Sequence, residues 1–368
     1  MKRIIFLIMA LLLFTACTSH KKPVIVESSD KKMEKYELEF YDTFDTVITA
    51  VIYSSDEEKA NEDLNYLAKR YRELNALFDR YKTHDGLVNV KTINDNAGKN
   101  PVKVDPTLYE LIKFSKENYT KISNKTNIAM GPIIDVWKAY SDKYIEGKNK
   151  EEVKKIMGNY LPDQAYLESL RQYTNIDGII LNDEERSVFL KYPQMSLDLG
   201  AVAKGYATEI IGEELRQKGV ESLLISAGGN VKIVGSPVDG REYFSIGIQN
   251  PDLEDENPVI LTLKAKDISI VTSGDYQRYF DLDGKRYPHI IDPDSLRPSD
   301  NLKSATVILK DSGLCDFIST AAFLSNNDEI EEIANKTNSK IIWIDSNLDI
   351  KGTQGAEEYI DEGWLNEK

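Results

Sequence analysis

"ISIVTSGDYQRYFDLDGKRYPHIIDP", residues 268–293, consists of apolar and β-branched runs separated by short polar turns. The runs predict strands at 268–272, 276–281 and 285–291. Asp283-Gly284 stands between the last two strands, and this dipeptide favours a two-residue hairpin turn. Strands joined by so short a turn pair antiparallel, so this segment predicts antiparallel sheet.

The flanking sequence extends the same pattern on both sides. Because runs of strands are interrupted by helices rather than alternating with them, we expect an α+β fold of mostly antiparallel sheets flanked by helices. Further strands are predicted within 36–53 and 176–192 and at 222–226, 231–234, 243–249, 259–264, 304–310 and 340–345, and helices at 56–80, from 105, and at 132–145, 149–157, 162–173, 201–218, 313–325 and 327–336.

The chain of 368 residues carries a formal net charge of -15 and 41% apolar residues. That apolar fraction is typical of a globular protein. The acidic balance excludes a general nucleic-acid binder, because neutralising phosphates requires clustered Lys and Arg. An anionic ligand would therefore need local positive charge from a helix N-terminus, a metal ion or a lysine.

The first residues are typical of an export signal. Lys2 and Arg3 precede a short apolar run at 4–14, and "LFTAC" resembles the bacterial lipoprotein cleavage box that ends in the lipidated cysteine. We expect a signal peptide at 1–16, lipidation of Cys17, a flexible tether at 17–35 and one domain at 36–368, with a division into two lobes left open. The protein would then be anchored to the outer face of the bacterial cell membrane or face the periplasm. An uncleaved signal anchor is the alternative.

"SLDLGAVAKGYATEI", residues 196–210, precedes and opens a predicted helix. The first amides of a helix have no partner within it, so phosphate oxygens could bind there beside Lys204. The simpler interpretation is that Asp198 caps the helix and that the lysine lies on the surface.

"LCDFISTAAFLS", residues 314–325, places Asp316 and Thr320 four residues apart and hence on one face of a helix. A carboxylate and a hydroxyl are oxygen ligands, which suit Mg²⁺ or Ca²⁺. Alternatively, Asp316 caps the helix and Thr320 bonds back to a carbonyl oxygen.

Two turn segments and one histidine complete the candidate residues. "SAGGN" contains Gly229 and predicts either a tight hairpin or a turn that lets a flat ring approach the backbone, and Thr272 stands at a strand end where hydroxyls commonly form turns. His289 precedes Asp292 by three residues, and an imidazole can accept a proton near neutral pH.

Six motifs in order, "TNIAMGPIIDVW", "DLGAVAKGYA", "SAGGN", "TSGDYQRYF", "HIIDP" and "CDFISTA", resemble the ApbE family of FAD:protein FMN transferases over residues 36–345. The resemblance implies an ApbE-like architecture related to the T-fold. It also implies transfer of FMN from FAD, with Mg²⁺, to a threonine hydroxyl of a flavoprotein acceptor, which could be a subunit of a membrane redox complex, with release of AMP.

The resemblance also assigns roles to residues of this chain. His289 is the base or proton shuttle, or alternatively a hydrogen-bond donor to the flavin or adenine, and Asp292 orients it or assists the metal. Metal ligands are Asp316, Thr320 and the main-chain carbonyl of Ala201. Contacts to FAD are assigned to Phe44, Tyr81, Thr126, Asn127, Asp198, Lys204, Gly229, Thr272 and His289. Asn127 departs from the aspartate usual in the family, and "FDT" at 44–46 stands where many members have Met-Gly-Thr.

Two other functions use the same residues. With water as nucleophile the site would be an FAD pyrophosphatase that gives FMN and AMP, and without turnover the protein would be a flavin-binding lipoprotein. The sequence does not separate transfer from hydrolysis, because both reactions need the same cation and the same diphosphate.

Overall fold

A computed structural model describes residues 32–362. The predicted signal peptide, Cys17 and most of the predicted tether lie outside the described residues. No helix in the described part of the chain is long and apolar enough to cross a membrane.

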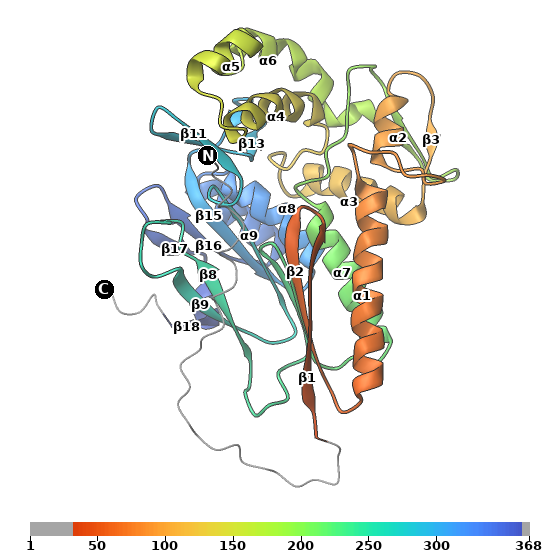
Figure 1. Ribbon diagram of the computed structural model, residues 1–368, viewed down its shortest axis with the longest axis vertical. Coiled ribbons are helices and arrows are strands. Elements are labelled where there is room, and N and C mark those ends of the chain that lie inside the picture. Colours follow the sequence, from red (N-terminus) through yellow and green to blue (C-terminus); the bar gives the residue numbers. More distant parts are fainter. Residues whose placement is uncertain (1–31, 363–368) are drawn as a thin grey trace, which may run out of the picture. The chain divides into compact units, whose positions relative to one another are not determined.

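The centre of the fold is an eight-stranded sheet in the order β1-β2-β6-β7-β10-β15-β16-β17 (Figure 1). Every neighbouring pair is antiparallel, which confirms the predicted sheet type. Its strands are β1 (Glu34–Thr43), β2 (Thr46–Ser54), β6 (Leu223–Ala227), β7 (Asn230–Val234), β10 (Ser269–Gly274), β15 (Leu302–Leu309), β16 (Lys340–Asp345) and β17 (Ile350–Gly352).

The two faces of this sheet pack against different layers. Along β7, Val231 and Ile233 belong to the hydrophobic cluster shared with the small sheet, whereas Val234 belongs to the cluster shared with the helices. Side chains alternate along a strand, so Asn230 and Lys232 also face the helices. The helical layer is α1 (Glu57–Phe78), α7 (Ala203–Gln217), α8 (Ser312–Phe323) and α9 (Asn327–Thr337), and the small sheet is β8 (Phe244–Gln249), β9 (Val259–Ala265) and β18 (Ile360–Glu362), with the 3₁₀ turn Ala356–Tyr359 before β18.

A third hydrophobic cluster lies between a group of helices and a hairpin. The rings of Tyr144, Phe280 and Tyr287 stack in sequence, with centroids 4.8 and 5.0 Å apart. This stack fixes the hairpin that leads into His289. The elements are α4 (Gly131–Ile145), α5 (Lys150–Met157), α6 (Gln164–Leu170), the 3₁₀ turn Arg171–Thr174, the hairpin β11 (Tyr279–Leu282) and β12 (Lys285–Pro288), and the pair β13 (Ile291–Asp292) and β14 (Arg297–Pro298).

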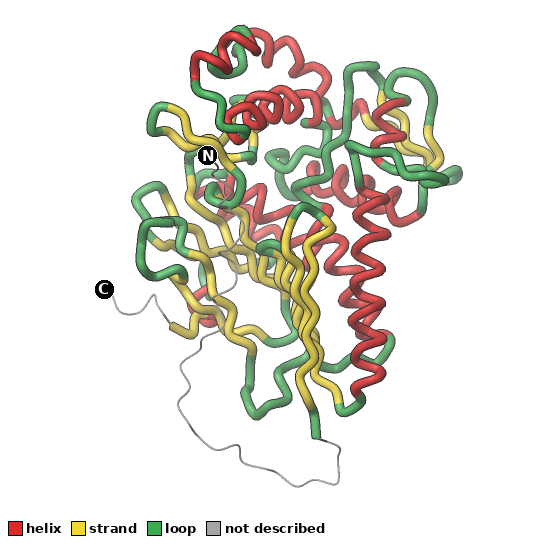
Figure 2. Tube along the Cα trace, in the orientation of Figure 1, coloured by secondary structure: helices red, strands yellow, loops and turns green. Residues whose placement is uncertain are grey.

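The remaining elements lie beside the C-terminal end of α1, where Figure 2 shows short strands in yellow next to helices in red. Asp105 caps α3 and Pro106 is its first residue, as predicted. The segment α2 (Val90–Asp95) was not predicted. The others are β3 (Val102–Lys103), α3 (Pro106–Lys121), the 3₁₀ turn Ile176–Gly178, β4 (Ile179–Asn182) and β5 (Ser187–Leu190).

Both predicted tight turns are present. Asp283 and Gly284 have φ of 51° and 78°, and Gly228 and Gly229 have φ of 54° and 90°, so each pair forms a two-residue hairpin with positive φ at both positions. The prediction of one continuous strand over 285–291 is wrong. The strand ends at Pro288 and pairing resumes at Ile291, so His289 lies in the break.

Candidate active site

The predicted residues converge where the beginning of α7 meets α8 and the end of β10. The backbone N–H of Gly205 on α7 donates to Oδ2 of Asp316 on α8 at 2.7 Å. The Thr320 hydroxyl lies 3.5 Å from that of Ser273 on β10. The next residue back along β10, Thr272, donates its backbone N–H to the carbonyl oxygen of Gly229 at 2.9 Å. Gly205 and Asp316, which are 111 positions apart in the sequence, are thus joined directly.

Asp316 does not cap its helix, so that alternative is wrong. The N-cap of α8 is Asp311, whose side chain accepts a hydrogen bond from the backbone N–H of Leu314. Asp316 is only 3% exposed and Thr320 only 8% exposed. Both oxygen groups therefore stand on one buried face of α8, next to the start of α7.

Burial raises the pKa of Asp316, and this rise is opposed by Lys204, the Gly205 N–H and the side chain of Asn230. The amide oxygen Oδ1 of Asn230 is buried and has no hydrogen-bond partner within residues 32–362. A buried carboxylate and an unpaired amide oxygen are both stabilised by a cation. With the Thr320 hydroxyl they form an all-oxygen set, which fits Mg²⁺.

A cation here would need more than acidic and imidazole ligands. No group of three or more His, Cys, Asp or Glu side chains in the described residues could hold a metal ion. Asp316 must therefore be joined by hydroxyl, amide or main-chain oxygens. Ala201, the predicted carbonyl ligand, lies half-buried in the turn just before α7.

Gly205 sets the distance between α7 and α8. A Cβ at this position would stand 2.4 Å from Cβ of Asp316, 2.4 Å from the carbonyl oxygen of Ser312 and 3.0 Å from Oδ1 of Asn230. The two helices therefore touch backbone to backbone at the predicted metal ligand. A side chain here would force them apart.

We expect Gly205→Ala to lower the free energy of unfolding by about 1–3 kcal/mol, because the added methyl group overlaps backbone and buried side chains. Urea denaturation of the variant and the wild type measures the difference. An unchanged midpoint would show that the helices have room at this contact.

The loop before α7 is held by Asp198, which also does not cap the helix. The N-cap position is Val202, which makes no side-chain cap. The carboxylate of Asp198 accepts instead from the Gly200 N–H at 2.8 Å and from Arg80 at 2.6 Å. The predicted open helix N-terminus needs correction too, because the N–H of Ala203 donates to the carbonyl oxygen of Leu199 and that of Gly205 donates to Asp316.

Arg80 is a site residue that the sequence analysis missed, although it stands beside Tyr81 in "FDRYK". Its side chain is 8% exposed and lies between Asp198 and Asp135, at 2.6 and 2.8 Å. The guanidinium carbon also lies 5.3 Å from the centre of the Tyr81 ring. Arg80 therefore links the loop before α7 to Tyr81, one of the predicted FAD contacts.

Tyr81 and Phe44 stand in different surroundings. Tyr81 is 51% exposed, and its backbone N–H donates to Asp79 at 2.7 Å, so the ring is displayed from a fixed loop. Phe44 has φ of 51° and packs its ring edge-on against Tyr71. The carbonyl oxygen of Phe44 accepts a hydrogen bond from Arg278 at 3.3 Å, which connects this turn to the histidine segment.

His289 is exposed and oriented by a backbone group. Its Nδ1 lies 3.1 Å from the carbonyl oxygen of Arg278, and its backbone N–H donates to the same oxygen at 3.0 Å. Desolvation of the imidazole by the surrounding protein lowers the pKa of His289 from 6.5 to about 4, and the positive charges of Arg278 and Lys204 act in the same direction. The imidazole is therefore neutral at pH 7, and Lys204 acts on both His289 and Asp316.

Asp292 does not orient His289, which corrects that part of the prediction. Its carboxylate accepts from the backbone N–H groups of Asp294 and Ser295, at 3.1 and 3.2 Å, and so stabilises the turn after β13. The carbonyl oxygen of Arg278 takes the orienting position. A backbone carbonyl accepts only from a donor, so Nδ1 carries the proton and Nε2 is the free acceptor.

Two further predicted FAD contacts, Thr126 and Asn127, lie in the loop before α4. Thr126 is buried and donates to the carbonyl oxygen of Phe317 on α8 at 2.8 Å. Asn127 donates to the carbonyl oxygen of Thr174 at 2.9 Å and accepts from the Ala129 N–H at 2.8 Å. The Thr126 bond holds the loop before α4 against α8, and the Asn127 bonds hold the same loop to the 3₁₀ turn that ends at Thr174. Both side chains therefore have structural hydrogen-bond partners.

Thr272 is the last predicted contact, and its hydroxyl lies 2.9 Å from that of Thr306 on β15. This bond joins two neighbouring strands of the central sheet. Gly229 accepts the backbone N–H of Thr272, so the hairpin between β6 and β7 lies directly beside the end of β10. Thr272 and Gly229 therefore fix the part of β10 from which the Ser273 hydroxyl approaches that of Thr320.

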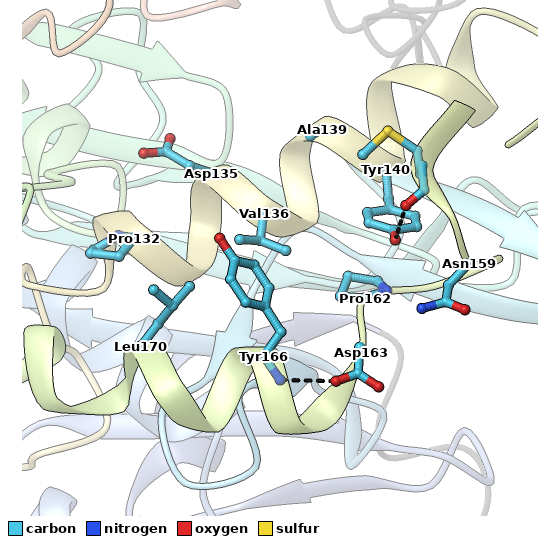
Figure 3. A pocket seen from close by; sticks show the side chains of 11 residues that line it. Pro132, Asp135, Val136, Ala139, Tyr140, Asn159, Pro162, Asp163, Tyr166 and Leu170 are labelled. Atoms are coloured by element: carbon cyan, nitrogen blue, oxygen red, sulfur yellow. Dashed lines mark hydrogen bonds between the residues drawn. The ribbon is translucent and has the colours of Figure 1, made fainter. Parts of the chain in front are cut away.

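A groove of about 620 Å³ lies between α4 and α6 and is lined by both helices and the segment that connects them (Figure 3). Figure 3 shows the Tyr166 ring pointing from α6 toward Val136 on α4. None of the predicted site residues lines the groove. Its connection to the site is Asp135, which lines it and pairs with Arg80.

The fold and the site together define an α+β protein in which buried oxygen groups of α8 and β7 lie near a lysine whose charge also acts on a neutral imidazole. The ApbE family model matches residues 44–343, and the chain belongs to the ApbE family. The predicted resemblance and fold class are thereby confirmed.

Relatives extend over most of the chain. A FAD:protein FMN transferase of Klebsiella pneumoniae is 36% identical over 273 residues, which cover 74% of this chain and 77% of the relative. A protein of the same name from Haemophilus influenzae is 27% identical over 350 residues, covering 93% and 91%.

Solved structures share the fold. The ApbE protein of Thermotoga maritima has a TM-score of 0.76 at 24% identity, covering 89% of this chain and all of that one. The flavin transferase ApbE of Vibrio cholerae has a TM-score of 0.72 at 20% identity, covering 89% and 100%.

Proposed function

We propose that this protein transfers FMN from FAD to a threonine hydroxyl of a flavoprotein acceptor and releases AMP, with Mg²⁺ bound at Asp316 and Thr320. The predicted enzyme class agrees with relatives that are named FAD:protein FMN transferase. The observation that carries the proposal is the bond between Gly205 and Asp316. It brings a buried carboxylate to the start of the helix that bears Lys204, whose charge also acts on His289.

The chain's own groups fit the steps of this transfer. The threonine oxygen forms a bond to the FMN phosphorus, the bond from that phosphorus to the AMP oxygen breaks, and AMP leaves with the electron pair. Nε2 of neutral His289 accepts the threonine proton, because Nδ1 is engaged with the Arg278 carbonyl oxygen. Lys204 contributes positive charge near the phosphates. Bound Mg²⁺ would supply charge stabilisation to the phosphoryl oxygens.

Location and partner belong to the same proposal. The basic residues Lys2 and Arg3, the apolar run and Cys17 support export and lipid anchoring, and all of them lie outside the described residues. An exported enzyme of this kind would modify acceptors on the outer side of the membrane. Mass analysis of Cys17-containing peptides from the membrane fraction tests the anchor, and an unmodified thiol would contradict it.

The function is tested by incubating the protein with FAD, Mg²⁺ and a candidate flavoprotein acceptor, followed by mass spectrometry. A mass gain of one FMN on an acceptor threonine, with AMP released in equal amount, supports transfer. Free FMN and AMP without a modified acceptor favour the pyrophosphatase alternative. Binding of FAD without either product favours a flavin-binding protein without turnover.

We expect Tyr81→Ala to weaken FAD binding by about 10-fold, since stacking of an aromatic side chain on a flat ring contributes about 1–3 kcal/mol. Tyr81 is displayed next to Arg80, and the loop that holds it is anchored through backbone bonds that the substitution keeps. Quenching of FAD fluorescence by the protein measures the dissociation constant.

The matched control is Tyr166→Ala. Tyr166 is 54% exposed, close to the 51% of Tyr81, but it lines the groove on α4 and α6. Its removal should leave the FAD dissociation constant unchanged. Equal losses in both variants would contradict a specific stacking role for Tyr81.

A further inference from the structure

Two hydrogen bonds join α7 and α8 side by side. The Gly205 N–H donates to Oδ2 of Asp316 at 2.7 Å, and the Ser312 N–H donates to Oε2 of Glu209 at 2.6 Å. The two positions on α7 are four residues apart, as are the two on α8. The helices therefore run antiparallel here and are held at two successive turns. The second bond, between Glu209 and Ser312, we call the register clamp.

The register clamp is built on a buried ion-pair network. Lys232 on β7 is 1% exposed, and its Nζ lies 2.9 Å from Oε2 of Glu209 and 3.1 Å from Oε1 of Glu213. Its methylene groups pack against Gly212, where a Cβ would stand 2.5 Å from Cδ and Cε. A lysine so deeply buried is stable only when paired, so Lys232 and the two glutamates form one unit.

Glu209 and Glu213 differ in their second contact. Both carboxylates pair with Lys232, and Glu213 also pairs with Arg216 on its own helix at 3.3 Å, whereas only Glu209 accepts the N–H of Ser312, the first residue of α8. That N–H is one of the donors that a helix leaves without an internal partner. The negative charge of Glu209 at this end is also favourable for the helix dipole. Glu209 therefore fixes the beginning of α8 against α7 and β7.

We infer that Glu209 is a positioning residue for the metal site, holding α8 in register with α7 so that Asp316 and Thr320 stand opposite Lys204. The inference rests on the proposed function, since it assigns the Mg²⁺ site to these ligands. Without the register clamp, α8 would keep one of its two bonds to α7 in the described part of the chain and could rotate or slide about Gly205. Asp316 uses Oδ2 to hold Gly205, so a small shift of α8 changes where its other oxygen points.

The test compares Glu209→Ala with Glu213→Ala in the full chain. Mg²⁺ binding is measured by isothermal titration with FAD present, and stability by thermal unfolding without Mg²⁺. Both variants leave Lys232 with one carboxylate, so we expect similar losses in unfolding temperature. Only Glu209→Ala should also weaken Mg²⁺ binding, by about 10-fold, which is the loss typical when a group that orients a metal ligand is removed.

Glu209→Gln separates the register clamp from the charge. The glutamine carbonyl oxygen can still accept the Ser312 N–H, although it no longer pairs with Lys232 as an ion. We expect Mg²⁺ affinity to return to within about twofold of the wild type while the unfolding temperature stays lowered. Equal Mg²⁺ affinities in Glu209→Ala and Glu213→Ala, or no recovery in Glu209→Gln, would overturn the inference.

The same titrations distinguish this inference from the proposed function. Wild-type protein that binds Mg²⁺ and FAD but modifies no acceptor threonine would remove the transfer reaction, while the inference would still be decided by the variants. Wild-type protein that binds no Mg²⁺ in the presence of FAD would overturn both.

Discussion

Asp316→Asn is expected to lower Mg²⁺-dependent transfer of FMN by about 100-fold or more, because a bound cation contributes several kcal/mol to stabilising the phosphoryl oxygens. Asparagine keeps the shape of the side chain and an oxygen that can accept the Gly205 N–H. It loses the negative charge that holds the cation. Turnover is measured as AMP release over a range of Mg²⁺ concentrations.

The same substitution should not destabilise the protein without metal. Burial raises the pKa of Asp316 in the folded state above its value in the unfolded chain. Its ionised form therefore costs stability, and this cost is relieved at low pH and fully present once the pH has risen through the folded pKa. At pH 8 without Mg²⁺, the asparagine variant should unfold at the same or a higher temperature than the wild type.

Asp311→Asn is the matched control on the same helix. Asp311 caps α8 through the Leu314 N–H, and asparagine is an equally good capping residue. This variant should keep both its turnover and its dependence on Mg²⁺. Wild-type turnover in Asp316→Asn at the same Mg²⁺ concentrations would remove Asp316 from the metal site.

Local signals account for the parts of the fold that could be predicted. Asp283-Gly284 and Gly228-Gly229 define their hairpins through residues that tolerate positive φ, and the cap at Asp105 defines the start of α3. Short pairings such as β3 with β5 and β9 with β18 were not predicted. The strands β3 and β18 are only two and three residues long and exist because a distant partner strand is present, which no local pattern encodes.

The residues of the candidate site also divide into those that the sequence could predict and those that it could not. Asp316, Thr320 and Lys204 stand in motifs that resemble a known family, so the sequence was enough to propose them. Arg80 and Glu209 could not be predicted, because Arg80 meets Asp198 across 118 residues and Glu209 meets Ser312 across 103. The resemblance also suggested that Asp292 orients His289, but its carboxylate accepts from the backbone N–H groups of Asp294 and Ser295 instead.

His289→Ala is expected to lower the rate of FMN transfer by about 10²–10⁴-fold, the range typical for loss of a general base, with little change in FAD affinity. The ring is exposed and Nε2 is the free acceptor, so its removal takes away a proton acceptor and leaves the packing intact. Single-turnover transfer and FAD titration measure the two effects separately. Weak FAD binding with an unchanged rate of transfer would instead assign His289 a binding role.

The pH dependence provides a second measure of the same role. Only neutral His289 can accept a proton, and its pKa is lowered to about 4, so kcat/KM should stay level from pH 8 to about 5 and fall at lower pH. Protonation of Asp316 could also produce an acidic limb. Arg278→Gln separates the two, because removing this positive charge raises the pKa of His289 and should move the limb to higher pH. A limb that does not move in this variant would assign it to Asp316.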